Sequence, residues 1–204
     1  MPAAPPRHNR SFAEPISGFQ AEKVLEYIAL FLKLSDRRIE KLKLVKLLYL
    51  TEREFLRKTG ELSLWDEYYS LPHGPICSSS LHIIDGYLDE DAANRIFAVQ
   101  NGKDLTLKDY ESSDQGYDYL SDSEISVARD VWEEHKHRTS SQLRNFTHQY
   151  CPEYKLINRG RIRIRVEDLM QAVGLDDIEE RAAEVDAYRE ALAQAGTRWS
   201  QETP

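Results

Sequence analysis

Two pairs of histidine and cysteine are the first candidates for a reactive or metal-binding site. His73 lies four residues before Cys77, and His148 lies three residues before Cys151. Imidazole and thiolate are common ligands of Zn²⁺, so these four side chains could in principle form a tetrahedral site. The spacing lacks the Cys-x-x-Cys pattern of such sites, and histidines of this kind more often bond to the backbone. We therefore expect no metal and no other cofactor.

A cysteine nucleophile is the second chemistry that these residues suggest. It would need a base within hydrogen-bonding distance, and His148 is near Cys151 only along the chain, with Pro152 directly after it. The sequence has no nucleophile elbow, phosphate-binding loop, dinucleotide-binding glycine motif or zinc-protease motif. We expect no catalytic residues and no enzyme, and we interpret Cys77 and Cys151 as small buried thiols.

Arginines alternate with aliphatic residues in the segment 159–166, which is the period of a β-strand. We expect one set to face the core and the other to face outward. The two sets are Ile162, Ile164 and Val166, and Arg161, Arg163 and Arg165. The arginines could contact nucleic-acid phosphates. Because the whole chain is acidic, we favour the protection of an edge strand from unwanted pairing or a contact with the chain's own acidic helix. An acidic protein partner is a further alternative.

Aromatic and acidic residues supply two candidate surfaces for binding a protein. Tyrosine and tryptophan often anchor protein interfaces, and an extended segment before a proline-rich turn holds three of them. The candidate contacts of this segment are Trp65, Tyr68, Tyr69 and His73. Packing within the protein is the alternative for these side chains. A C-terminal acidic helix supplies the second surface, with the candidates Glu179, Glu180, Glu184 and Asp186.

Helices must position most of these residues. Apolar residues recur at helical spacing in the segments 21–34, 122–138, 140–150 and 166–173, and an acidic, Ala-rich helix is expected over 176–195. The segment 40–58 has almost no polar face, so we expect it to be the buried central helix. Pro75 is typical of a first helical turn, and it predicts a further helix from Pro75 to about Leu88.

The β structure is expected to be small. Residues 96–107 alternate around Asn101-Gly102, a dipeptide that favours a hairpin turn because both positions tolerate positive φ. With the strand 161–166, this hairpin would form a small antiparallel sheet. The predicted fold class is therefore α+β and mostly α, with about six helices around the central helix.

Composition divides the chain into three parts. Residues 1–20 are rich in Pro and Ala and show no periodicity, which is typical of a flexible arm. We expect a single domain over 21–174, interrupted by a polar loop at 109–116. Residues 175–204 are expected to form the acidic helix and a tail.

The overall charge excludes several classes of protein. The chain has 204 residues, with 27 Lys and Arg against 35 Asp and Glu, which gives a formal net charge of −8. An acidic surface repels nucleic acid, so we do not expect nucleic acid as the main partner. No apolar run approaches the roughly 18 residues of a membrane helix, and the first 20 residues hold no apolar export signal. We expect a cytoplasmic protein that does not bind membranes.

Three segments stand out when they are taken in order: Leu44 to Leu50, Glu67 to Ile76 with its Gly74-Pro75 turn, and Leu143 to His148 followed by Pro152 and Tyr154. Together they resemble the Panacea antitoxin domain, also called the SocA-like family. The resemblance covers roughly residues 20–172 and departs from the family pattern at two positions. His73 stands where an aromatic residue is frequent, and Tyr154 stands where tryptophan is usual. The matching motif residues are Lys46, Leu47, Leu48 and Tyr49, then Gly74 and Pro75, and then His148 and Pro152.

This resemblance implies a mostly helical intracellular antitoxin that neutralises a protein toxin encoded beside it by direct binding. The family motif contains no catalytic residues. We expect the motif residues to be mainly structural, with Lys46 reaching the surface or pairing with a carboxylate. Family members face toxins of unrelated types, so the toxin's chemistry does not carry over.

Two other functions and the state of assembly stay open at this point. The chain could regulate its own operon by binding nucleic acid through the three arginines, or it could be an adaptor that delivers a partner to a protease. A homodimer and a toxin–antitoxin hetero-oligomer are both compatible with the sequence.

Overall fold

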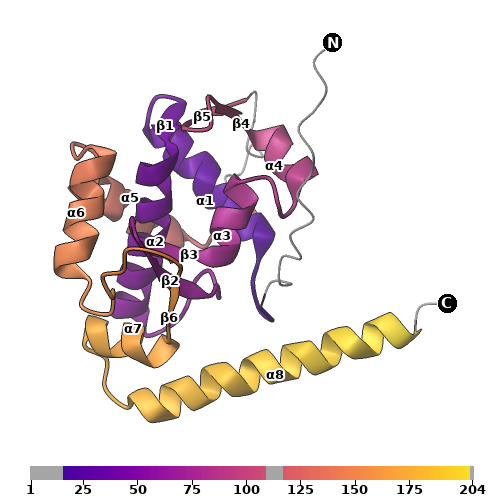
Figure 1. Ribbon diagram of the computed structural model, residues 1–204. Coiled ribbons are helices and arrows are strands. Elements are labelled where there is room, and N and C mark those ends of the chain that lie inside the picture. The colour runs from indigo at the N-terminus through magenta and orange to yellow at the C-terminus, as the bar shows by residue number, and fades with distance from the viewer. Residues whose placement is uncertain (1–15, 109–116, 203–204) are drawn as a thin grey trace.

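The computed structural model describes residues 16–108 and 117–202, with side chains as far as residue 195. Within these ranges the chain forms eight helices and two antiparallel sheets of three strands each (Figure 1). The predicted fold class, α+β and mostly α, is confirmed. Most of the predicted 1–20 arm and the whole 109–116 loop lie outside the described residues.

The central helix is α2, and its neighbours cover it on several sides. Contacts join α2 to α5, α6, α7, α3 and strand β3. Side chains that point to different sides of the helix are at most 1% exposed, namely Leu44, Leu47, Leu48 and Tyr49. The predicted burial of the central helix on all sides is therefore confirmed. The helices are α1 (Ala21–Leu34), α2 (Lys41–Thr59), α3 (Ser78–Ile84), α4 (Glu90–Ile96), α5 (Asp122–His135), α6 (Ser140–Tyr150), α7 (Val166–Val173) and α8 (Ile178–Glu202).

Local sequence signals explain several helix ends. Gly60 ends α2 in the left-handed conformation, with φ +78°, which glycine adopts without a steric penalty. Capping boxes begin α5 and α6, where Ser121 pairs with Glu124 and Thr139 pairs with Gln142.

One sheet contains the predicted hairpin. Strands β4 (Phe97–Gln100) and β5 (Asp104–Leu107) pair in antiparallel register around a turn in which Asn101 and Gly102 both have positive φ. The hairpin prediction is therefore confirmed. A third strand, β1 (Arg38–Glu40), pairs with β5 and gives the order β1-β5-β4. Strand β1 was not predicted, because three residues are too few to show a period.

The second sheet corrects the prediction of a single β element. Strand β6 (Ile162–Ile164) pairs with β2 (Tyr68–Leu71) and not with the hairpin, and the order is β3-β2-β6. The alternation in β6 is also only partly realised. Ile164 is buried, but Ile162, the first residue of this three-residue edge strand, is 38% exposed.

The prediction of a helix that begins at Pro75 is wrong. Residues Gly74–Cys77 form strand β3, and α3 begins only at Ser78. Pro75 lies opposite Ser70 in β2. Because β3 is the edge of its sheet, the missing N–H of proline is tolerated there. The expected helix is thus replaced by strand β3 and the short helix α3, and α4 follows as a separate helix beyond the predicted range.

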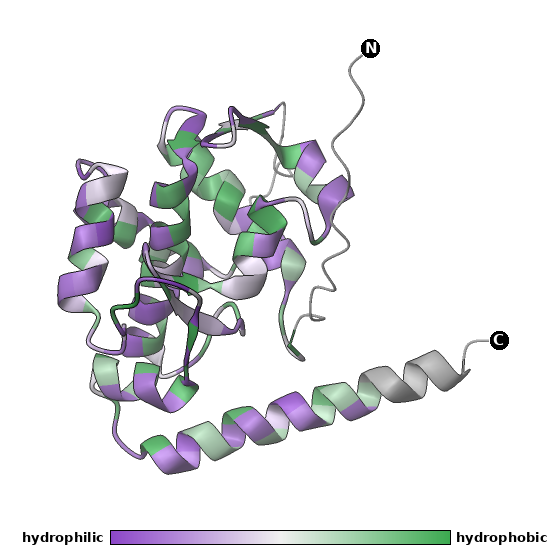
Figure 2. Ribbon diagram, viewed as in Figure 1, coloured by the Kyte–Doolittle hydropathy of each residue, from purple (hydrophilic) through white to green (hydrophobic). Residues whose placement is uncertain are grey.

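The last helix, α8, runs along one side of the body and extends beyond it (Figure 1). Ile178, Ala182, Val185 and Leu192 share one side of the helix and are buried or half-buried. Hydropathy alternates along the helix, as expected when one side is packed (Figure 2). No helix in residues 16–108 or 117–202 has the length and apolar character needed to cross a membrane.

Candidate interaction site

Lys46 is buried in the middle of the fold. It is 0% exposed, and its Nζ donates a hydrogen bond of 2.6 Å to the carbonyl oxygen of Pro75. The expectation that Lys46 reaches the surface or pairs with a carboxylate is therefore wrong, because β3 covers the helix at this point. Burial, with a smaller contribution from Arg144, lowers the pKa of Lys46 to about 7.

Gly74 fits against Lys46 because it has no side chain. Its φ is +98°, and a Cβ atom there would lie 2.9 Å from Thr147 Oγ1 and 3.0 Å from Lys46 Nζ. Three distant segments of the chain thus meet at one point: α2, the turn between β2 and β3, and the last turn of α6. The motif residues of the sequence analysis come from these same three segments.

The chain after α6 extends this meeting point. The His148 ring stacks on the Tyr154 ring at a centroid distance of 4.4 Å, and the Tyr154 hydroxyl donates to the Leu71 carbonyl in β2. Pro152 lies in the turn between them. His148 Nε2 is buried and has no hydrogen-bond partner in the described part of the chain.

The remaining motif residues form the support for this point. Tyr49 donates a hydrogen bond of 2.7 Å to Glu153 Oε1, which also accepts from Arg53. Leu47 and Leu48 lie in the hydrophobic core. These contacts join α2 to the segment that follows α6.

The two cysteines are free, buried thiols. Burial raises the pKa of Cys151 to about 12 and raises that of Cys77 well above its usual range. A thiol with a raised pKa is a poor nucleophile. Among the side chains of residues 16–108 and 117–195, no three His, Cys, Asp or Glu come together as a metal-binding group.

The aromatic candidates are largely covered. Tyr68 is 1% exposed and donates its hydroxyl proton to Glu52, so it is not available to a partner in this conformation. The Trp65 ring packs against Tyr188 of α8 at 4.7 Å. Tyr69 is half-buried.

The three arginines of the predicted strand each have a partner within the protein. Arg161 lies over the Tyr69 ring at 4.6 Å. Arg163 pairs with Glu67 at 3.3 Å. Arg165 pairs with Asp168 at 3.2 Å, at the start of α7.

The four acidic candidates of α8 are exposed to solvent, unlike the largely covered aromatic candidates. Ala182 and Val185 face the body, whereas the acidic side chains point away from it. Glu179, Glu180, Glu184 and Asp186 are all exposed.

Two buried carboxylates that were not predicted from the sequence accept hydrogen bonds from backbone amides. Glu52 accepts hydrogen bonds from the amides of Ser63 and Leu64 and from Tyr68, and burial raises its pKa to about 7. Asp66 binds the first amides of α3 in the same way. Glu52 thus holds the loop that follows α2, and Asp66 satisfies amides at the start of α3 that have no partner within the helix. The sequence did offer one signal for such groups, namely an acidic residue within a mainly apolar stretch. Glu26 of α1 is an example, because it is buried and accepts hydrogen bonds from the amides of residues 118–120.

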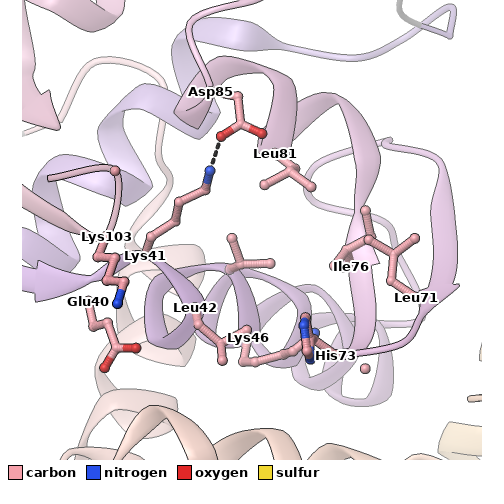
Figure 3. A pocket seen from close by; sticks show the side chains of 13 residues that line it. Glu40, Lys41, Leu42, Lys46, Leu71, His73, Ile76, Leu81, Asp85 and Lys103 are labelled. Carbon is pink, nitrogen blue, oxygen red and sulfur yellow. Dashed lines mark hydrogen bonds and ion pairs between the residues drawn. The ribbon is translucent and has the colours of Figure 1, made fainter. Parts of the chain in front are cut away.

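A pocket of about 570 Å³ lies directly beside Lys46. The start of α2, the β2–β3 turn, α3 and the hairpin turn surround it (Figure 3). Lys41 and Asp85 form an ion pair at one edge, and His73 and Lys46 lie together at another (Figure 3). Its apolar lining consists of Leu42, Val45, Leu71, Ile76 and Leu81.

Comparison with known proteins places these features in a family. Residues 44–153 match the family described as "Antitoxin SocA-like, Panacea domain". The matched segment runs from α2 to just beyond α6, so it includes Lys46, Gly74 and His148. Neither the curated proteins nor the solved structures gave a match.

Proposed function

Because the chain belongs to the SocA-like Panacea antitoxin family, we propose that it neutralises a protein toxin by binding it directly. The match over residues 44–153, more than half of the chain, is the observation that carries this proposal. The motif residues Lys46, Leu47, Leu48, Tyr49 and Gly74 are buried. Of the motif residues, only His148 is partly exposed and Pro152 exposed. The buried ones can act on a partner only through the surface that they support.

The exposed acidic side of α8 is one surface that supports the proposal. A toxin that acts on RNA or nucleotides needs a basic site for its substrate, and an acidic surface accelerates encounter with such a site. We assign this role to Glu179, Glu180, Glu184 and Asp186. Trp65 lies under α8 and Tyr68 is buried, so neither belongs to this surface.

The arginine contacts favour this function over nucleic-acid binding. A guanidinium that already stacks on Tyr69 or pairs with Glu67 or Asp168 must give up that contact before it can bind a phosphate. An adaptor function would need a further activity, since the toxin's half-life would have to fall in the presence of the chain. Neutralisation requires only that the toxin be masked.

Co-expression tests the proposal. The adjacent reading frame is expressed alone and with the chain in the cytoplasm of a bacterial host, where we expect the pair to act. Growth arrest by the first and recovery with the second support neutralisation, and unchanged toxin abundance argues against an adaptor. A neighbour that is not toxic, or a toxin whose arrest persists, would contradict the proposal.

A further inference from the structure

The segment 155–165 concentrates positive charge in an otherwise acidic chain. It contains five Lys or Arg residues and no Asp or Glu, whereas the whole chain has a net charge of −8. We call residues 155–165 the basic segment. It follows the turn after α6, includes strand β6 and ends where α7 begins (Figure 1). All five of its cationic side chains are exposed, namely Lys155, Arg159, Arg161, Arg163 and Arg165.

Acidic residues of the protein compensate only part of this charge. Arg163 and Arg165 each form one ion pair, and the Arg163 side chain is still 55% exposed. Arg161 lies over the ring of Tyr69, which is uncharged. Lys155 and Arg159 have no ion-pair partner in the part of the chain that the structure describes. The basic segment therefore presents an excess of positive charge to solvent.

Aliphatic side chains are exposed within the same segment. Leu156 is 75% exposed and Ile162 is 38% exposed. A partner that covered them would remove apolar surface from water, which favours association. The phosphate backbone of a nucleic acid has few apolar groups to offer here, whereas a polypeptide has many. The combination of cations and aliphatic groups therefore fits a protein partner better than a nucleic acid.

Strand β6 also leaves one backbone edge open. In the order β3-β2-β6 it pairs with β2, and no strand of the described chain lies on its other side. Alternate residues of an antiparallel strand direct their N–H and C=O groups towards that side. The opposite edge of the sheet contains Pro75, which has no N–H to donate. An extended peptide can satisfy the groups along β6 by adding as a further strand.

The charge of the basic segment selects which strand can be added. Two copies of β6 would repel each other, because both carry arginines, so this edge disfavours pairing with a second copy of the chain. An acidic strand is attracted by the same arginines. The side chains that protect the edge from one kind of partner thus favour another.

We propose that the basic segment is the docking site for an extended, acidic segment of the toxin, which adds as a strand to the open edge of β6. This inference rests on the proposed function and names the surface and the partner chemistry that the function uses. The toxin's carboxylates meet Arg159, Arg161 and Arg163, and its aliphatic side chains cover Leu156 and Ile162. Hydrogen bonds along β6 offset any arginine contact that a carboxylate displaces, an advantage that a phosphate backbone lacks.

This docking site complements the acidic surface of α8. Helix α7 joins β6 to α8 (Figure 1), so the chain presents two surfaces of opposite charge on either side of α7 in the sequence. A toxin that carries both a basic site and an acidic segment would be held in one orientation, because the reverse orientation places like charges together.

The first test uses the full chain without a toxin. The probe is a short peptide of alternating Glu and Val, blocked at both ends, and amide NMR shifts report its binding. We expect saturable shifts in residues 155–164. In the saturated complex, the β6 amides that face the open edge should exchange with deuterium at least about tenfold more slowly. The same peptide with Gln in place of Glu should bind at least about tenfold more weakly.

Surface variants locate the binding without disturbing the core. The triple variant Arg159→Gln, Arg161→Gln, Arg163→Gln should weaken binding of the Glu peptide about tenfold or more, and its amide spectrum shows whether it is folded. A matched control changes the net charge equally at three other exposed cations, Arg95→Gln, Lys103→Gln and Arg129→Gln.

Four results would overturn the proposal. They are equal affinity for the Glu and Gln peptides, unchanged exchange of the β6 amides, equal effects of the two triple variants, and tighter binding of duplex DNA than of the Glu peptide at residues 155–164. The last result would assign the basic segment to nucleic acid.

The second test uses the toxin from the adjacent reading frame. The triple variant at residues 159–163 should bind it at least about tenfold more weakly than the wild-type chain, and the control variant should not. Unchanged toxin affinity in the triple variant overturns the docking site and leaves the proposed function intact. If the wild-type chain itself fails to bind the toxin, the proposed function fails, and the docking role fails with it.

Discussion

Lys46 and Pro75 are joined by a hydrogen bond of 2.6 Å, from the buried ammonium group of the central helix to the carbonyl of an edge strand. This contact links residues that lie 29 positions apart in the chain. It accounts for a cation among the buried apolar residues of α2 and for a Gly-Pro pair at a turn. The two motifs are therefore halves of one structural contact, and the pocket lies directly beside it.

Gly74→Ala tests how tightly this contact is packed. The added Cβ would be held at φ +98° and lie 2.9 Å from Thr147 Oγ1 and 3.0 Å from Lys46 Nζ. We expect the free energy of unfolding to fall by about 3 kcal/mol, from backbone strain and overpacking together. Urea unfolding measures it. Gly160→Ala is the control, since it has φ +80° with open space around it, and it should cost about 1 kcal/mol.

Lys46→Met tests the buried charge through pH. Burial holds the pKa of Lys46 at about 7 in the folded chain, against about 10.4 when unfolded. Between these values the unfolded chain binds more protons, so this residue's contribution to stability falls as pH decreases towards 7. Between pH 7 and 8 the wild-type free energy of unfolding should rise by about 1 kcal/mol relative to Lys46→Met. A constant difference between the two proteins would contradict the buried charge.

Glu52→Gln tests a buried carboxylate whose contribution to the free energy of unfolding falls, and does not rise, as pH increases. Burial raises the pKa of Glu52 to about 7, so the folded chain binds more protons than the unfolded chain between about pH 4.3 and 7. The stability due to this group is present at the acidic end and lost as pH rises towards 7. The substitution should flatten that decline, as followed by thermal unfolding across the range. The same slope in both proteins would count against this assignment.

Charge reversal on α8 tests the proposed encounter surface. Changing Glu179, Glu180, Glu184 and Asp186 to Lys should slow association with the toxin about tenfold at low salt and weaken its salt dependence. The control reverses four other exposed acids, Glu22, Glu61, Asp89 and Asp91, and changes the net charge equally. Stopped-flow measurements give the rates. Equal effects of the two sets would mean that only the total charge matters.

Local signals in the sequence predicted much of the fold. The Asn101-Gly102 turn, the helix that begins at residue 122 and the burial of α2 depend on residues close together in the chain, and the structure bears them out. The errors arise where a distant segment decides the outcome. Pro75 adopts a strand because β2 lies beside it, and β6 joins the same strand in preference to the hairpin.

The candidate site was likewise predicted only in part. The family resemblance pointed to Lys46, Gly74 and His148, and the structure brings these residues together. It could not reveal the pocket, because Leu42, Leu71 and Leu81 come from three separate elements. Buried carboxylates such as Glu52 were missed, since their loop partners lie far along the chain or follow no regular spacing.

Stoichiometric inhibition of the purified toxin tests the central claim most directly. The toxin from the adjacent reading frame is titrated with the purified chain while its activity and the mass of both proteins are followed. We predict that activity falls to zero at a fixed molar ratio, with a complex formed and both masses unchanged. Loss of activity through cleavage or modification of the toxin, or full activity in the presence of excess chain, would contradict neutralisation by binding.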